Sequence, residues 1–186
     1  MPVEFSDAED IGELGTAAFL RIGESPGSGG YRGALFIVNA RGEPVEFSYN
    51  SVDVPNGFLW RPSDIRRHAV RSIATSIFQT CQATPRVLIC LGTEIDHEVL
   101  SNDIRLAIPV CRLAPALETL SRSPSEQVVS LSTDTPMNAF WSPGKPAEGS
   151  MESRLFSRLV GAGLLMEPFD RIQCGLEEVY RDRAKE

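Results

Sequence analysis

Acidic residues and a histidine crowd into the segment EIDHE, and these residue types could bind a metal ion. Glu94 and His97 have the Glu-x-x-His spacing of di-metal carboxylate proteins, but those proteins need a second such pair. His97 and Glu98 also begin an H-E-x-x-H pattern, yet Ser101 stands where the second histidine would be. We therefore expect a solvated acidic turn here, and we expect neither a metal nor another cofactor.

Covalent catalysis would need a serine or cysteine beside a base, with a third group to orient that base. The sequence has two histidines, His68 and His97, and no G-x-S-x-G motif. A pair between His97 and either Cys81 or Cys111 stays open. An enzyme whose site is assembled from scattered residues, for example Cys111, His97 and Glu94, is therefore one alternative.

Glycines gather in SPGSGGYRG, where they could form a phosphate-binding loop. Such loops lie between a strand and a helix, but this segment precedes a strand and lacks the G-K-[ST] ending. We interpret Ser25 to Gly30 as a turn.

An arginine patch at the start of a predicted helix is the strongest candidate for a binding surface. Two aromatic residues come just before it, and the candidate set is Phe58, Trp60, Arg61, Arg66, Arg67 and Arg71. In one interpretation the guanidinium groups, the helix N-terminus and the rings face an anion, a nucleic-acid base or a partner's pocket. In the other, the rings pack under the helix and the arginines pair with Asp53, Asp64 or other surface acids.

A second candidate contact lies in TPMNAFWSPGKPAEGS, whose Pro, Gly and Ser content predicts a loop. Phe140 and Trp141 on that loop could anchor a partner, because exposed aromatic residues contribute much of the energy of interfaces. They could equally form a lid over the core.

Composition limits the possible partners. The chain has 186 residues, 42% hydrophobic and 23% charged, the balance of a globular protein. A net charge of −7 argues against a protein that coats nucleic acid or an anionic membrane, although a local basic patch could still bind. The beginning of the sequence is acidic and has no signal-peptide pattern, and the four cysteines are widely spaced, so we expect buried free thiols in a soluble cytoplasmic protein.

The first half of the chain predicts three strands and a helix. Continuous or alternating apolar patterns mark strands at 16–22, 31–39 and 44–50, joined as an antiparallel meander, with Pro44 at a strand start or a sheet edge. Apolar residues at helical spacing then predict an amphipathic helix over 63–81, with Ser63 as its N-cap.

The second half predicts further strands and a closing helical pair. We expect strands at 86–92, 104–113 and 127–133, a helical turn at 93–103 and a short helix within 114–125. Pro109 would interrupt the second of these strands, at an edge or a bulge. Ser150 is a candidate N-cap for one helix, and Pro168 suits the first turn of another.

These elements predict one α+β domain over 1–186, with an antiparallel or mixed sheet and helices packed on it. The sheet and helix core would cover about 14–133, a loop 134–149, and the C-terminal helices 150–183. The order of three strands, a helix and two strands is similar to the general arrangement of small profilin-like or roadblock-like modules. That resemblance of arrangement implies a scaffold or dimerisation role.

The resulting functional hypothesis is a non-catalytic accessory subunit of a larger, bacterial, cytoplasmic assembly. Its partner would be another protein subunit or a second copy of the chain, bound at the arginine patch and its aromatic neighbours. The alternative is a nucleic-acid-contacting component of a DNA repair or phage-defence complex that uses the same patch. We expect no membrane partner.

Overall fold

The computed structural model describes residues 11–27, 29–54 and 57–183. A short 3-10 helix η1 (Ile11–Leu14) leads into a meander of three antiparallel strands, β1 (Thr16–Glu24), β2 (Tyr31–Asn39) and β3 (Pro44–Val52). Pro44 is the first residue of β3, which is an edge strand, so its missing N–H costs no ladder hydrogen bond. The predicted meander is confirmed.

The chain then crosses the sheet to add strands on the other side of β1. A 3-10 turn η2 (Gly57–Leu59) precedes the long helix α1 (Pro62–Thr80), which leads to β4 (Val87–Leu91), parallel to β1. After the π-helical turn η3 (Val99–Asp103), β5 (Val110–Pro115) lies parallel to β4. The two remaining strands, β6 (Gln127–Leu131) and β7 (Met137–Ser142), are antiparallel additions beyond β5.

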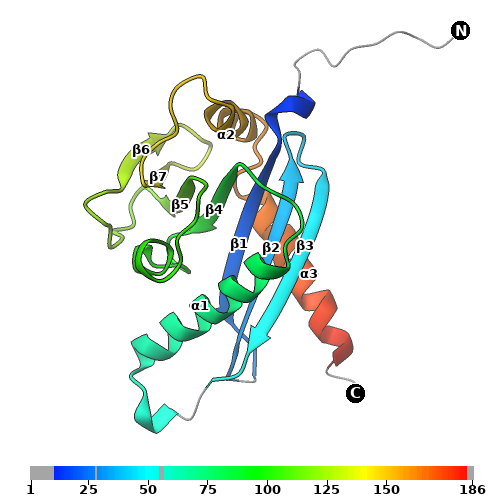
Figure 1. Cartoon of the computed structure of the whole chain (residues 1–186), viewed down its shortest axis with the longest axis vertical. Coiled ribbons are helices and arrows are strands. Elements are labelled where there is room, and N and C mark those ends of the chain that lie inside the picture. The colour runs from blue at the N-terminus through cyan, green and yellow to red at the C-terminus, as the bar shows by residue number, and fades with distance from the viewer. Residues whose placement is uncertain (1–10, 28, 55–56, 184–186) are drawn as a thin grey trace, which may run out of the picture.

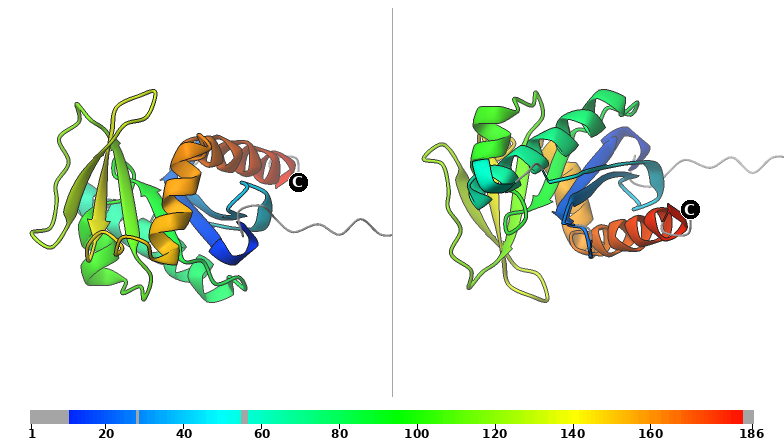
Figure 2. Two further views of the ribbon diagram at one scale, coloured as in Figure 1. Left: turned by 90° about the horizontal axis from the view of Figure 1, so that it is seen from above. Right: turned by 90° about the horizontal axis from the view of Figure 1, so that it is seen from below.

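The result is a seven-stranded mixed sheet with the order β3-β2-β1-β4-β5-β7-β6 and helices on both faces. Alternate residues of β1 show how both faces are filled. Ala18, Leu20 and Ile22 pack against α1, whereas Ala17 and Phe19 pack toward α2 (Met151–Gly161) and α3 (Glu167–Arg183). Figures 1 and 2 show α1 on one face and the C-terminal helices on the other. The predicted α+β class and helical pair are confirmed.

The structure differs from the predictions in five respects. Residues 137–142, expected within a loop, form β7. The strand expected at 104–113 begins only at Val110, and no helix forms within 114–125. Helix α1 begins at Pro62, and its N-cap residue is Arg61 and not Ser63. The Arg61 side chain forms no capping hydrogen bond. Cys174 is exposed and Cys81 half-buried, so only Cys90 and Cys111 are buried thiols.

In the described part of the chain, no helix combines the length and the apolar character needed to span a membrane.

Candidate functional site

In this topology a site is most expected beyond the carboxyl ends of the two central parallel strands, β1 and β4. From β1 the chain first builds β2 and β3 on one side and then crosses through α1 to build β4 and β5 on the other. Ligands of α/β sheets bind beyond the carboxyl ends of strands at such a switch point. Here that position lies between the end of β4, the segment after it and the first turns of α1.

An ion pair joins β1 to the segment that follows β4. Arg21, on β1, donates from Nε to Oε1 of Glu94 at 3.0 Å, and the amide of Ile22 donates to Oε2 at 3.3 Å. Burial raises the pKa of the Glu94 carboxyl, and the Arg21 guanidinium opposes that rise. Glu94 is therefore held by β1 and does not point freely into the space beyond the strands.

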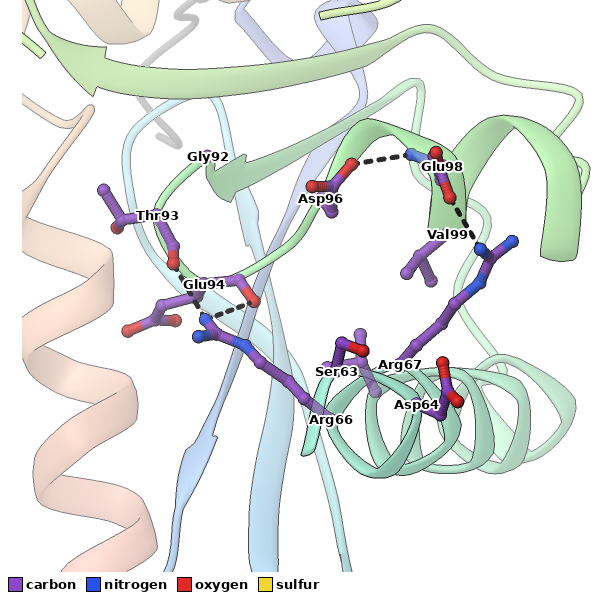
Figure 3. A pocket seen from close by; sticks show the side chains of 11 residues that line it. Ser63, Asp64, Arg66, Arg67, Gly92, Thr93, Glu94, Asp96, Glu98 and Val99 are labelled. Carbon is purple, nitrogen blue, oxygen red and sulfur yellow. Dashed lines mark hydrogen bonds and ion pairs between the residues drawn. The ribbon is translucent and has the colours of Figure 1, made fainter. Parts of the chain in front are cut away.

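A cavity of about 470 Å³ lies between α1 and the segment that follows β4. Figure 3 shows Arg66 reaching from α1 to the main chain of this segment, where Nη2 donates to the carbonyls of Thr93 (2.8 Å) and Glu94 (3.2 Å). The other lining groups are mixed in charge: Ser63, Asp64, Arg67, Asp96 and Glu98, with Val70, Gly92 and Val99. Because acids outnumber arginines, the cavity alone is a poor anion site.

Two of the four arginines of the patch are already paired with acids. Arg67 binds both carboxylate oxygens of Asp103, at 2.7 and 2.8 Å, and also Glu98 at 2.6 Å. These contacts raise the pKa of Arg67 and lower that of Asp103. Arg61 pairs with Asp64 at 2.8 Å, but its side chain remains 83% exposed. Arg67 therefore connects α1 to η3 through its ion pair with Asp103. Arg61 remains exposed enough to bind another anion.

Within the described residues, Arg66 contacts main-chain carbonyls and Arg71 contacts a histidine ring. Arg66 is bound by the two carbonyls described above, and Nη2 of Arg71 lies 3.5 Å from Nδ1 of His68. Arg71 is exposed on α1, and its charge also contributes to the lowered pKa of Asp103. Among the residues that the structure describes, no carboxylate forms a hydrogen bond with the guanidinium of Arg66 or of Arg71.

The aromatic residues before α1 lie outside the core. Phe58 is 84% exposed, Leu59 77% and Trp60 39%. The indole of Trp60 leans on the His68 ring of α1, with centroids 5.1 Å apart and planes inclined by 56°. Trp60 is thus positioned by a contact on one side and remains accessible on the other. We call Phe58, Trp60, Arg61, His68 and Arg71 the Trp60 row.

The prediction that Phe140 and Trp141 could be exposed and anchor a partner is wrong. Both residues belong to β7 and are buried, with Trp141 only 1% exposed. Trp141 packs edge-on against Phe156 of α2, and Phe140 lies on the opposite face near the guanidinium of Arg112. The Pro- and Gly-rich flanks gave the segment the appearance of a loop, but β5 and β6 pair with it on both sides.

The residues considered for catalysis are distributed over different layers of the fold. Cys111 is buried toward α2 and α3, and burial raises the pKa of its thiol well above the ordinary value. His97 lies on the α1 side, where Nδ1 contacts Asp96 at 2.8 Å and Ser121 Oγ at 3.5 Å. Glu94 is bound to Arg21. No described contact joins Cys111, His97 and Glu94.

The EIDHE segment forms the turn after β4 and the entry to η3. Among residues 11–27, 29–54 and 57–183, no group of three or more His, Cys, Asp or Glu side chains could hold a metal ion.

Sequence reasoning missed Arg21, although a signal was present. Arg21 is a charged residue within the apolar run TAAFLRI, and a buried strand tolerates such a residue only when it is paired. Leu59, 77% exposed, was also missed as part of the exposed surface.

Comparison with known proteins gives a likeness of fold only. No protein-family model matches the sequence, and no curated protein matches it. Endonuclease V from Bacillus subtilis matches with a TM-score of 0.55 and 10% identity over 90% of this chain and 82% of the other. Endonuclease V from Streptomyces avermitilis matches with a TM-score of 0.56 and 13% identity over 89% and 83% of the two chains. The chain thus has the fold of these endonuclease V structures.

A structure of Marinitoga piezophila Argonaute with guide RNA and target DNA also matches, at 9% identity over 80% of this chain and 26% of the other. Its TM-score of 0.35 is too low to support an argument. The likeness that supports an argument is therefore the one to the two endonuclease V structures, and it is a likeness of fold.

Proposed function

We propose that this protein contacts nucleic acid through the Trp60 row, as a component of a DNA repair or phage-defence complex. The observation that carries the proposal is the position of Trp60. Its ring is accessible on the side of α1 that carries two exposed guanidinium groups, those of Arg61 before the first turn and Arg71 near the middle of the helix.

The chemistry of the row suits nucleic acid. Guanidinium groups bind phosphate oxygens through parallel N–H donors, and they remain charged at any physiological pH. Aromatic rings stack on bases without requiring a sequence. The α1 N-terminus adds partial positive charge at the same end of the row, beside Arg61.

The fold supports the same class of function by analogy. The two structures that match over most of their length are both named endonuclease V, an enzyme class that acts on nucleic acid. Contact with nucleic acid is the activity proposed for this chain, and Glu94, in the segment after β4, serves the fold by accepting hydrogen bonds from Arg21 and the amide of Ile22.

The net charge of −7 requires the binding to be local. The field of the whole molecule opposes a polyanion, so the row must supply the attraction at short range. Such binding weakens steeply with salt, because each neutralised phosphate releases counterions. Affinity should therefore be measurable at low salt and fall as salt is raised.

Fluorescence anisotropy with a labelled oligodeoxynucleotide, supplied in single-stranded and duplex form, tests the proposal. Arg61→Ala and Arg71→Ala should each weaken binding and reduce the salt slope by about 1. Arg181→Ala is the matched control, because Arg181 pairs with Glu178 at i,i+3 on α3, just as Arg61 pairs with Asp64. Absence of binding to either form at low salt, or binding indifferent to salt, would overturn the proposal.

A protein partner is the second candidate, favoured by one observation. Phe58 and Leu59 are adjacent apolar residues, both more than three-quarters exposed, and Leu59 has no role in stacking. Together with Arg66 and Arg67 they would serve an accessory subunit. A Phe58→Ser/Leu59→Ser variant that loses a specific protein from a native pull-down, while its nucleic-acid affinity is unchanged, would favour this candidate.

A further inference from the structure

We infer that the Trp60 row binds single-stranded nucleic acid, with bases stacked on Trp60 and Phe58, in preference to a duplex. This rests on the proposed function and specifies its substrate class. The distinguishing feature is that the two rings offer exposed faces beside exposed charges.

Trp60 is positioned before any ligand binds. Its contact with the half-buried His68 ring restrains the indole on one side, and the remaining 39% exposure leaves surface for a base. An aromatic ring has few rotatable bonds, and a ring that is already packed loses little further entropy on binding. Phe58, at 84% exposure, provides a second ring in the η2 turn just before it.

The charges lie along the same side of α1 as the indole. His68 is in contact with Trp60 and, three residues further along the helix, with Arg71. Arg61 precedes the first turn, and Arg71 lies ten positions further along the chain, which corresponds to about 15 Å of helix. The exposed pair between Arg61 and Asp64 costs little to exchange for a phosphate, since such surface pairs contribute little to stability. A strand backbone could therefore follow the helix while its bases turn to the rings.

A duplex cannot use this arrangement without cost. In a double helix the base faces are stacked on one another, so a protein reaches only the base edges and the backbone. Exposing a base face to Trp60 would require unstacking. In a single strand the base faces are available, and stacking on an aromatic ring tolerates any base. The rings therefore add affinity for a single strand, whereas duplex binding would depend on the arginines alone.

The protein carries its own reporter for this test. Of its two tryptophans, Trp141 is 1% exposed inside the core, so a ligand-induced change in emission reports on Trp60. The full chain is titrated at low salt with an oligodeoxythymidylate and, separately, with a duplex of the same length. We expect the single strand to quench Trp60 and to bind about tenfold or more tightly than the duplex.

Variants separate stacking from charge. Phe58→Ala and Trp60→Ala should each weaken single-strand binding about tenfold or more and leave duplex binding nearly unchanged. Trp60→Phe should retain the affinity but lose the fluorescence signal. Leu117→Ala is the control for an exposed apolar side chain elsewhere, because Leu117 is fully exposed. If Trp60→Ala fails to fold, Phe58→Ala and Trp60→Phe still decide the question.

The outcomes are distinguishable. Equal affinity for duplex and single strand, or tight single-strand binding with no quenching of Trp60, overturns the inference and leaves nucleic-acid contact standing. No binding of either form at low salt overturns the proposed function itself.

Discussion

Arg21 and Glu94 form an ion pair with 3.0 Å between Nε and Oε1, across the end of the sheet between β1 and the segment after β4. Their side chains are 28% and 18% exposed. Arg21 also donates from Nη1 to the carbonyl of Phe169 on α3, at 3.4 Å. One guanidinium thus joins the segment after β4 to α3 at the position where the topology would place a site.

Replacing Arg21 by Met should destabilise the protein by about 1–3 kcal/mol at pH 7, because Glu94 is left partly buried without its cation. The raised pKa of Glu94 gives the sign of the pH dependence. The folded state holds this proton more tightly than the unfolded state, so ionisation costs stability as pH rises through the raised pKa. The loss in R21M should therefore be smaller at pH 4 than at pH 7, measured by urea unfolding. An equal loss at both pH values would contradict this account, and Arg181→Met, at an exposed ion pair, is the control.

Substitution within the buried pair of Arg112 and Glu126 should cost more stability than substitution of Arg21. Both side chains are 2% exposed, and Arg112 donates to both carboxylate oxygens, at 2.8 and 2.9 Å. Glu126→Ala should lower the free energy of unfolding by about 3–5 kcal/mol, because it leaves a buried guanidinium without its anion. Arg112→Met/Glu126→Leu should recover much of that loss. Denaturant unfolding of the two variants decides this, and a double variant less stable than Glu126→Ala would refute it.

Acid should destabilise the protein through Asp103 and Glu46. The hydrogen bonds from Arg67 lower the pKa of Asp103. Burial alone would raise the pKa of Glu46, but the amides of Ala83 and Gln82 donate to its carboxylate and lower the pKa overall. The unfolded state therefore binds these protons more readily, and stability present above about pH 4 is lost as pH falls through the folded-state pKa values.

The Glu46→Gln/Asp103→Asn variant should accordingly show a shallower fall of unfolding free energy with falling pH than the wild type. Thermal or urea unfolding at several pH values below neutral measures this slope. Asp134→Asn, at an exposed position, should keep the wild-type slope. The idea fails if the double variant has the same slope as Asp134→Asn.

Gly33 should not tolerate a side chain. A Cβ at this position on β2 would lie 2.7 Å from Ile22 Cγ1, 2.8 Å from Ile73 Cγ2 and 2.9 Å from the Arg21 carbonyl oxygen. Gly33→Ala should cost about 1–3 kcal/mol, because α1 or β1 would have to shift. Gly23→Ala is the matched control, since nothing lies within 4 Å of its added Cβ, and should change stability by no more than about 0.5 kcal/mol.

Trp60 should be the accessible tryptophan in the free protein. Acrylamide should quench the emission of Trp60 and leave that of Trp141 largely unaffected, because Trp141 is 1% exposed. The emission of Trp60→Phe should accordingly be nearly insensitive to acrylamide. A Trp60→Phe variant quenched as readily as the wild type would mean that β7 is not packed as described.

The regular elements of the N-terminal half could be predicted because their signals are local. In β2 the apolar run Ala34 to Val38 indicates burial on both faces, and in α1 the spacing of Ile73 and Ile77 indicates one buried side. The segment at 137–142 could not be predicted in this way. Its proline and glycine neighbours favour a loop, and only pairing with β5 and β6 makes it a strand.

The candidate site was predicted in part. Trp60 and the exposed arginines Arg61 and Arg71 lie on the surface, as one of the two interpretations requires. Arg67 follows the other interpretation, because Asp103 and Glu98 bind it. The choice depends on which acids the fold brings near each guanidinium. Asp103 lies 36 positions from Arg67, so no spacing in the sequence indicates the pair.

The sequence by itself determined the periodicity of the strands and helices, the α+β class and the position of an arginine patch after two aromatic residues. These properties depend on neighbours within a few positions, where backbone geometry fixes which side chains share a face. Tertiary structure alone decided the strand order, the Arg21–Glu94 ion pair and the outward position of Trp60. Each of these depends on contacts between segments far apart in the chain, and local preferences do not specify such contacts.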